Sequence, residues 1–285
     1  MVTVFGQGKT AEDLMKSATS TMPELGTDIL LEVPGKESLD FIRPGQPMRP
    51  TSNIYGSASN FSNYAKRLAT GKDELTSTRY PWKKSIVTTV FWIGEQAAKN
   101  NPVPNDKSSW DARWMNNYGG VDRPTVRHEY LPVGFKPGQN PFYAALPYND
   151  ITGKGTKPEA RMVIPWFKEE FARDGTSVCK GRWLAIRKGN KVCYAQWEDC
   201  GPFRTDHWEY VFGNERPKPN LNNGAGLDVS PAIKDYLGLD STDVTDWKFV
   251  TAEEVAAGPW AMHGNNNTFV QSAQVFLSDL RGKPR

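Results

Sequence analysis

Two stretches of sequence decide the expected fold, Trp197-Glu198-Asp199-Cys200-Gly201-Pro202-Phe203 and Gly226-Leu227-Asp228-Val229-Ser230-Pro231-Ala232-Ile233. Each ends a strand-like run on a lone carboxylate, Asp199 in the first and Asp228 in the second. A carboxylate at the end of a strand lies where a loop begins, and binding and catalytic residues are common in loops held by a rigid scaffold. The chain around these two residues therefore decides both the fold and the candidate site.

A β-hairpin precedes Asp199. The ranges 183–187 and 192–197 are rich in β-branched, aromatic and apolar residues, as strands are. Between them, Gly189 and Asn190 tolerate the positive φ of a two-residue turn, so we place a tight turn there.

The position of the turn predicts an antiparallel register in which two cysteines lie opposite each other. It pairs Lys188 with Lys191, Ile186 with Cys193, Arg182 with Trp197, and Cys179 with Cys200. Side chains directly opposite each other lie about 4.5–5.5 Å apart at Cβ, so Cys179 and Cys200 could form a disulfide. Cys193 would be left over.

A short helix follows Asp228. Ser230 is a favoured N-cap, Pro231 fits the first helical position, and Gly238 fits the stop. Asp228 would lie just outside the N-terminus of this helix, where the partial positive charge favours the ionised carboxylate. Residues 204–223, rich in Asn, Pro and charged residues, are predicted to be a loop.

These motifs together resemble the double-psi β-barrel superfamily, which includes expansins, barwin, family 45 glycoside hydrolases and lytic transglycosylases of the rare lipoprotein A type. The Glu-Asp-Cys-Gly-Pro-Phe run is similar to the Asn-Asp-Arg-Gly-Pro-Phe of rare lipoprotein A, and Gly-Leu-Asp-Val-Ser is similar to the Asp-Leu-Ser of expansins. The resemblance covers about residues 84–252. It implies a mostly β fold, a six-stranded double-psi β-barrel with long loops, short helices and an extended N-terminal arm.

Two further segments fit this resemblance. Residues 85–92 are similar to the first barrel strand, and Glu95 follows where family 45 enzymes place a catalytic Asp. An ordinary solvated glutamate is the alternative for Glu95. Residues 142–147 resemble a segment of rare lipoprotein A in which a functional His stands at the position of Tyr143, so we place Tyr143 among the substrate-binding candidates.

The resemblance implies that the chain cleaves glycosidic bonds, as a glycoside hydrolase or a lytic transglycosylase. Hydrolysis commonly needs two carboxyl groups ~5–9.5 Å apart, whereas lytic cleavage can proceed with one. By analogy with family 45 enzymes Asp228 is the general-acid candidate, and by analogy with rare lipoprotein A Asp199 is the acid/base candidate. Burial of Asp199 against Trp197, Tyr143 and Phe203 would raise its pKa and exchange these roles.

The alternative is a non-catalytic, expansin-like or barwin-like protein that binds glycan or serves in assembly, with both Asp residues capping turns. Either way, flat aromatic rings complement the apolar faces of sugars. The expected substrate-binding residues are Tyr143, Trp197, Trp110, Trp114 and Trp208. Most of the ten Trp residues are expected to pack in the core.

Beyond these motifs we expect an N-terminal arm over residues 1–83, the barrel over 84–252 and a tail over 253–285. In the arm we expect a short helix near 11–18, a strand at 29–33 and a helix around 60–68. Self-assembly of the protein through this arm is a further expectation. Residues 161–165 are predicted to be a strand, 167–172 a helical turn, and 269–280 a helix.

Composition excludes several functions. A net charge of +3 without a basic run argues against nucleic acid, and no apolar stretch approaches the ~20 residues that cross a bilayer. His128, His207 and His263 lack metal-ligand spacing, and Gly6 to Thr10 lacks the full phosphate-loop pattern, so no metal or other cofactor is expected. A weakly polar barrel with ten Trp residues and a possible cystine favours a secreted or periplasmic protein, although this chain carries no signal-peptide pattern.

Overall fold

A computed structural model describes residues 80–99, 101–153 and 155–281. The helices expected near 11–18 and 60–68, and the strand expected at 29–33, lie outside these residues. Within the described part the chain is mostly strand, with a few short helices. No helix in that part is long and apolar enough to cross a membrane.

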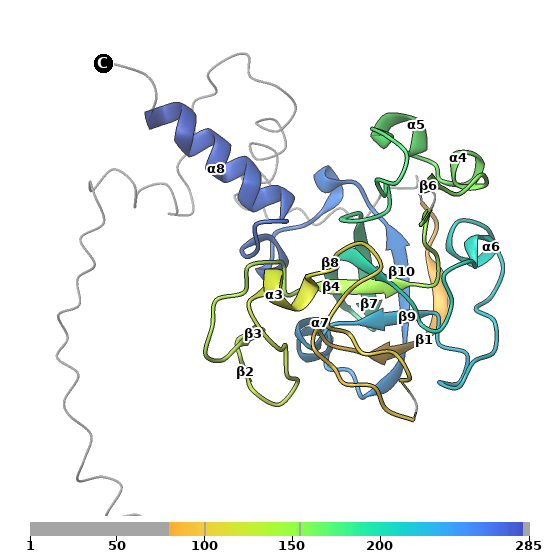
Figure 1. The fold of residues 1–285 in the computed structure, drawn as a ribbon. Coiled ribbons are helices and arrows are strands. Elements are labelled where there is room, and N and C mark those ends of the chain that lie inside the picture. The colour runs from red at the N-terminus through yellow and green to blue at the C-terminus, as the bar shows by residue number, and fades with distance from the viewer. Residues whose placement is uncertain (1–79, 100, 154, 282–285) are drawn as a thin grey trace, which may run out of the picture. The chain divides into compact units, whose positions relative to one another are not determined.

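The central feature is a closed barrel of six strands (Figure 1). Around the barrel the order is β1, β10, β7, β8, β4 and β9, and β9 pairs with β1 to close it. The strands are β1 (Lys83–Val90), β4 (Tyr143–Leu146), β7 (Trp183–Lys188), β8 (Lys191–Cys200), β9 (Leu227–Val229) and β10 (Thr242–Phe249).

The barrel mixes parallel and antiparallel neighbours. β1 with β9 and β4 with β8 are parallel, whereas the other four neighbouring pairs are antiparallel. Parallel strands cannot be joined by a tight turn, so each parallel pair requires a long crossover of the chain. As a result, the ends of β8 and β9 meet β4 from opposite sides, although they are far apart in sequence.

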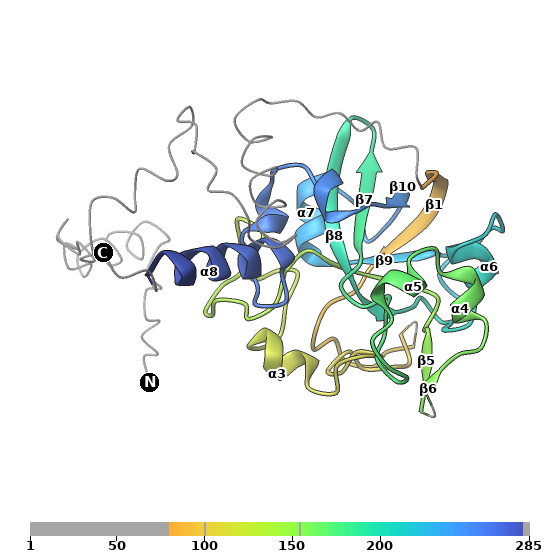
Figure 2. The same ribbon diagram turned by 90° about the horizontal axis from the view of Figure 1, so that it is seen from above.

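The hairpin expected from the sequence is confirmed. β7 and β8 pair Lys188 with Lys191 and Ile186 with Cys193, and Gly189 takes a positive φ of 56° in the turn. Figure 2 shows this hairpin as two long strands side by side.

The helix expected after Asp228 is also confirmed, as α7 (Pro231–Leu237). The Ser230 hydroxyl accepts a hydrogen bond from the backbone N–H of Ile233 at 3.4 Å, and Gly238 ends the helix with a φ of 68°. The buried face of α7 includes Ala232, Ile233 and Leu237. Local capping and an apolar face therefore suffice to explain this helix.

Removing the Ser230 cap is expected to lower the free energy of unfolding by ~1 kcal/mol, because Ser230→Ala leaves the buried N–H of Ile233 without its partner. Urea denaturation would measure the change. Ser241→Ala is the matched control, because Ser241 is exposed and its backbone carbonyl, not its hydroxyl, bonds Val90. Equal stability of the two variants would contradict the capping role.

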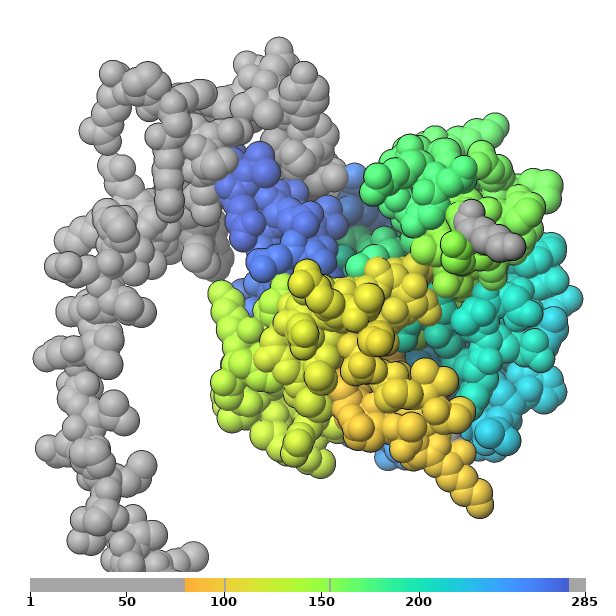
Figure 3. Space-filling model, viewed as in Figure 1, coloured from red at the N-terminus to blue at the C-terminus, as the bar shows by residue number. Residues whose placement is uncertain are grey.

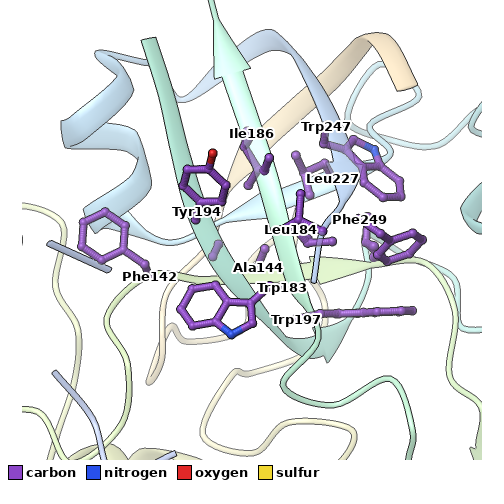
Figure 4. Packing of buried hydrophobic residues seen from close by; sticks show 14 of the residues in the cluster. Phe142, Ala144, Trp183, Leu184, Ile186, Tyr194, Trp197, Leu227, Trp247 and Phe249 are labelled. Atoms are coloured by element: carbon purple, nitrogen blue, oxygen red, sulfur yellow. The ribbon is translucent and has the colours of Figure 1, made fainter. Parts of the chain in front are cut away.

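The interior of the barrel is filled by aliphatic and aromatic side chains. Figure 4 shows Leu184, Ile186 and Leu227 pointing into the space between the strands, near the large rings of Trp247 and Phe249. All five are buried. Such packing holds the strands in one register, because a one-residue slip would turn every inward side chain outward.

A second cluster covers part of the outer wall of the barrel. It contains Phe91, Ile93, Trp114, Tyr118, Tyr143 and Ala145. Tyr143 and Ala145 come from β4, whereas Phe91 to Tyr118 belong to the segment that leaves β1. Figure 3 shows this segment, gold to yellow, lying over the front of the barrel. It includes α3 (Trp114–Tyr118), and β2 (Arg127–His128) with β3 (Leu131–Pro132) follow.

The remaining elements are short. They are β5 (Ile151–Thr152), β6 (Gly155–Thr156), α4 (Ala160–Val163), α5 (Phe167–Glu170), α6 (Trp208–Val211), η3 (Ala252–Glu254), η4 (Pro259–Ala261) and α8 (Thr268–Arg281). The helices expected at 167–172 and 269–280 are confirmed as α5 and α8. The strand expected at 161–165 is wrong, because α4 begins at Ala160 and its carbonyl accepts the N–H of Ile164. Residues 204–223, expected as a loop, contain α6.

Candidate active site

Four residues form a row across the outer wall of the barrel. Thr89 of β1 is paired with Asp228 of β9, Asp228 with Ala145 of β4, and Ala145 with Asp199 of β8. Residues paired across neighbouring strands project from the same face of a sheet. Thr89, Asp228, Ala145 and Asp199 therefore lie on one face.

Alternation along the strands shows that this face is the outer one. Leu227 and Val229, on either side of Asp228, are buried in the main core, as are Ala144 and Trp197 on β4 and β8. Ala145 instead belongs to the cluster outside the barrel. The two carboxylates thus point away from the barrel interior, toward the segment that covers the wall.

The two carboxylates are separated by a single strand. Two interstrand spacings place their backbones roughly 9–10 Å apart. The strand between them carries only the methyl group of Ala145 at this level. Gly201 also lies here, because a Cβ added to it would stand 3.5 Å from Asp228 Oδ2 and 4.0 Å from Ala145 Cβ. Two small residues thus occupy the space beside Asp228.

Asp228 is a carboxyl group with a raised pKa. Burial raises its pKa to about 7, and repulsion from Glu95 and Asp199 adds to the effect, while a hydrogen bond from the Thr89 hydroxyl to Oδ1 opposes it. The residue keeps partial contact with solvent. The helix N-terminus was expected to favour the ionised form, whereas the pKa of Asp228 is raised, with burial as the largest cause.

Asp199 accepts more hydrogen bonds than Asp228 does. Its Oδ1 accepts hydrogen bonds from the backbone N–H groups of Ser109 and Cys200, both at 2.7 Å. Burial raises its pKa to about 6, although these bonds stabilise the anion. Asp199 is 8% exposed. The covering segment reaches it through Ser109, so two parts of the chain fix one oxygen of this carboxylate.

Glu95 also belongs to this end of the barrel. Burial raises its pKa, and its charge in turn raises the pKa of Asp228. Asn105 donates a hydrogen bond to Glu95 Oε2 at 3.0 Å and its backbone N–H to the Glu95 carbonyl at 2.9 Å. The structure therefore brings Glu95, Asp199 and Asp228 within electrostatic range, and Glu95 is not an ordinary solvated glutamate.

A fourth carboxyl group, that of Glu198, was not among the candidates from sequence. It occupies the bulge at which β8 shifts its register against β4, between Trp197 and Asp199. It is 2% exposed, its Oε1 accepts a 3.0 Å hydrogen bond from Asn266, and its Oε2 has no partner within the described residues. Burial raises its pKa to about 7. The signal in the sequence was two adjacent acids at the end of a strand, where strict alternation would bury one of them.

Three of the five aromatic substrate-binding predictions are wrong. Trp114, Tyr143 and Trp197 are at most 1% exposed, so their rings have no free face for a sugar. Trp110 is half-buried, with its ring edge against Trp197 and its Nε1 donating to Asn149 Oδ1 at 2.8 Å. Trp208 is also half-buried. Trp110 and Trp208 remain predictions.

Tyr143 has a structural environment instead. Its hydroxyl donates to Asp122 Oδ2 at 2.9 Å and accepts the backbone N–H of Ile93 at 3.0 Å. Its ring packs edge-on against Phe91 and Trp114. Phe203, the third residue expected to shield Asp199, is 41% exposed.

The expected disulfide is not formed: Cys179, Cys193 and Cys200 are all free thiols. Two backbone bonds explain this. Trp197 donates its N–H to Arg182 and accepts the N–H of Gly181, so two residues face one and the register expected beyond Arg182 is shifted. Cys179 consequently lies in a turn rather than opposite Cys200.

The buried carboxyl groups are expected to make the protein less stable as the pH rises. For Asp228, Asp199 and Glu198 the folded pKa lies above the ordinary value of 3.8 or 4.5, so the folded state binds more protons than the unfolded state. Their contribution is complete below about pH 4 and is lost as the pH rises to about 7. Asp228→Asn should reduce this loss by up to ~4 kcal/mol, because the pKa of Asp228 is raised from 3.8 to about 7 and each pKa unit corresponds to ~1.4 kcal/mol.

Urea denaturation of the wild type and of Asp228→Asn at pH 4.5 and 7.5 would measure the effect. The variant should be the more stable of the two at pH 7.5 and should lose its advantage at pH 4.5. Asp174→Asn, which removes an exposed carboxylate, is the control. A wild type that gains stability between pH 4.5 and 7.5 would rule out this assignment of protons.

No group of three or more His, Cys, Asp or Glu side chains within the described ranges is arranged to hold a metal ion. The site thus consists of carboxyl groups, the Thr89 hydroxyl and backbone donors. Comparison with models of known protein families gives no match, and comparison with curated proteins gives none either.

Proposed function

We propose that the chain is a polysaccharide-active enzyme that cleaves glycosidic bonds with Asp228 and Asp199. One observation carries the proposal: both residues are paired with Ala145 from opposite sides, so two carboxyl groups with raised pKa values share one outer face. Pairs of titratable groups whose environments differ are typical of acid/base sites.

The two carboxyl groups suit different roles. Asp228, with a pKa of about 7, keeps its proton for a larger fraction of molecules at neutral pH and serves as general acid toward the leaving oxygen. Asp199, with a pKa of about 6 and two N–H donors on Oδ1, is the more ionised and serves as base. The second oxygen of Asp199 would take a proton from the attacking water.

We take the two residues to act by inversion. Inverting enzymes hold their carboxyl groups ~6.5–9.5 Å apart, with room for water, and retaining enzymes ~5–5.5 Å apart. The backbones of Asp199 and Asp228 lie two interstrand spacings apart, which is compatible with the larger range. In a lytic transglycosylase Asp199, the acid/base that the resemblance to rare lipoprotein A implies, would give its proton to the leaving oxygen. It would then take the proton of the sugar hydroxyl that attacks in place of water.

We further propose that the barrel is a double-psi β-barrel. Its support is the closed order of six strands with two parallel pairs, together with the motifs that resemble the superfamily over residues 84–252. Secretion, or a periplasmic location, now rests on the glycan substrate, because the cystine that favoured export is absent.

The product of the reaction tests the proposal. Wild type, Asp199→Asn and Asp228→Asn would be incubated with cellulose and with peptidoglycan, and reducing ends and anhydro-sugar ends would be counted. Reducing ends identify hydrolysis, and anhydro ends identify lytic cleavage. Release that both variants retain in full would refute the assigned centre.

A non-catalytic glycan-binding role is the second candidate. The low exposure of Asp199 favours it, because an acid or base must reach the scissile bond. In that case the wild type would bind the insoluble glycan and release nothing. Self-assembly through the N-terminal arm, residues 1–83, remains a prediction that the described residues do not test.

A further inference from the structure

Phe203 is an exposed aromatic residue in an unfavourable backbone conformation. It is 41% exposed, and its φ of 59° lies in the left-handed region that bulky residues rarely adopt. Its ring contacts no other aromatic ring in the described part of the chain. Neither the exposure nor the conformation stabilises the fold, and backbone strain of this kind is common at ligand sites.

Phe203 forms one wall of an open groove of about 780 Å³. Two segments line it, residues 203–206 and 219–221. Leu221, in the second of these segments, is 74% exposed. The volume lies within the range of ~300–1,000 Å³ that is typical of ligand sites.

The groove lies close to the candidate active site. Gly201 stands beside Asp228 Oδ2, and only Pro202 separates it from Phe203. Two residues span at most ~7 Å of extended chain. A polymer that reaches Asp228 past Gly201 therefore meets the Phe203 groove within about one or two sugar units.

Two of the residues that line the groove form an ion pair. Arg204 and Asp206 approach each other at 3.7 Å, and both side chains are exposed. Their charges cancel, and at the rim Lys157 donates a hydrogen bond to the Thr205 carbonyl at 2.7 Å. All three side chains can exchange hydrogen bonds with hydroxyl groups, and an apolar ring face with such groups around it fits an uncharged sugar.

We infer that the groove formed by residues 203–206 and 219–221 is a subsite for a neutral sugar unit of the glycan, with the ring of Phe203 as its stacking platform. The inference rests on the proposed function, because it takes the same polymer to occupy Asp228. It adds the substrate class and assigns binding to a residue outside the acid/base pair.

The test measures binding without cleavage. Titration calorimetry in the Asp228→Asn background would use cellohexaose, chitohexaose and polygalacturonate. One of the two neutral oligosaccharides should bind, and Phe203→Ala should weaken that binding roughly tenfold. Phe203→Tyr should preserve the affinity, because it keeps the ring. Met262→Ala, which removes an exposed side chain outside the groove, should have no effect.

A second variant separates binding from folding. Phe203→Gly removes the ring and also relieves the positive φ, so it should raise the melting temperature while it weakens binding. A lower melting temperature with unchanged affinity would mean that the ring is structural, and the inference would be overturned. Binding of polygalacturonate alone, or of none of the three glycans, would overturn it as well.

The two proposals can fail separately. If the wild type cleaves no glycan but its binding depends on Phe203, the subsite stands and the enzymatic function fails. If Asp228→Asn abolishes cleavage while Phe203→Ala leaves affinity unchanged, the function stands and the subsite fails.

Discussion

Replacing Asp228 by Asn is expected to lower the rate of glycan cleavage by about 100- to 10,000-fold, the usual contribution of a general acid. The amide has nearly the shape of the carboxyl group and can still accept the hydrogen bond from Thr89. It cannot transfer a proton to the leaving oxygen. The loss should therefore appear in the turnover rate more than in the affinity for the glycan.

The pH dependence of cleavage gives an independent check on these roles. Cleavage requires Asp228 protonated and Asp199 ionised, so the rate should fall above about pH 7 and below about pH 6. The two groups repel each other, so the limits belong to the pair. In Asp228→Asn the fall above pH 7 should disappear from any residual activity.

The measurement is the initial rate of product release from the glycan that the wild type cleaves, between pH 4.5 and 9. Asp174→Asn is the control, because Asp174 is an exposed carboxylate in a surface ion pair. A rate within tenfold of the wild type for Asp228→Asn, with the fold intact, would remove Asp228 from the chemistry. A rate that does not change between pH 6 and 9 would have the same meaning.

Local signals in the sequence were enough to predict the hairpin and the helix beside the site. A two-residue turn and the alternation on either side of it fix the register of β7 and β8, and Ser230, Pro231 and Gly238 fix α7. These features depend on residues close together in the chain. The hairpin and the helix are present in the structure because the tertiary packing is compatible with them.

Features that depend on distant partners were not predictable. The bulge that buries Glu198 exists because β8 must follow both β7 and β4, and the bulge at Gly181 and Arg182 removed the expected disulfide. The bulge at Gly181 and Arg182 leaves no local signature, and the adjacent acids Glu198 and Asp199 indicate only that one of the two is buried. The burial of Trp114 likewise depends on β4, which lies beyond a segment of irregular chain.

The pKa of Asp228 shows the same limit. The sequence places it before a helix N-terminus, which lowers the pKa of a solvated carboxylate. The structure adds burial, Glu95 and Asp199, and all three raise it. The degree of desolvation of Asp228 depends on the segment that covers the barrel wall. The direction of the pKa shift therefore could not be predicted from the motif alone.

A buried polar cluster of Tyr143, Asp122 and Arg127 holds the segment that covers the outer wall of the barrel. Asp122 is completely buried and accepts hydrogen bonds from Tyr143 and from Arg127, whose side chain is 4% exposed. Arg127 also donates to the carbonyl of Tyr130. The cluster thus ties β4 to β2 and to the segment that reaches Asp199.

Asp122→Ala is expected to lower the free energy of unfolding by about 3–5 kcal/mol, because it leaves the buried guanidinium of Arg127 without its main partner. Asp122→Asn should cost less, since an amide oxygen can still accept from Tyr143. Combining Asp122→Ala with Arg127→Met should recover part of the loss, because it also removes a buried charge that would keep only the partly exposed Asp235, at 3.5 Å, as a partner.

Urea denaturation of the single and double variants would give the coupling energy between Asp122 and Arg127. The reference is the exposed pair of Arg161 and Asp174, whose side chains are 52% and 65% exposed, so that Arg161→Ala should cost at most ~1 kcal/mol. Because the cluster anchors the segment that donates to Asp199, loss of Asp122 should also reduce glycan cleavage where the protein still folds. If Asp122→Ala lowered the free energy of unfolding no more than Arg161→Ala does, the buried pair would not stabilise this segment. Some other contact would then have to position the segment over Asp199.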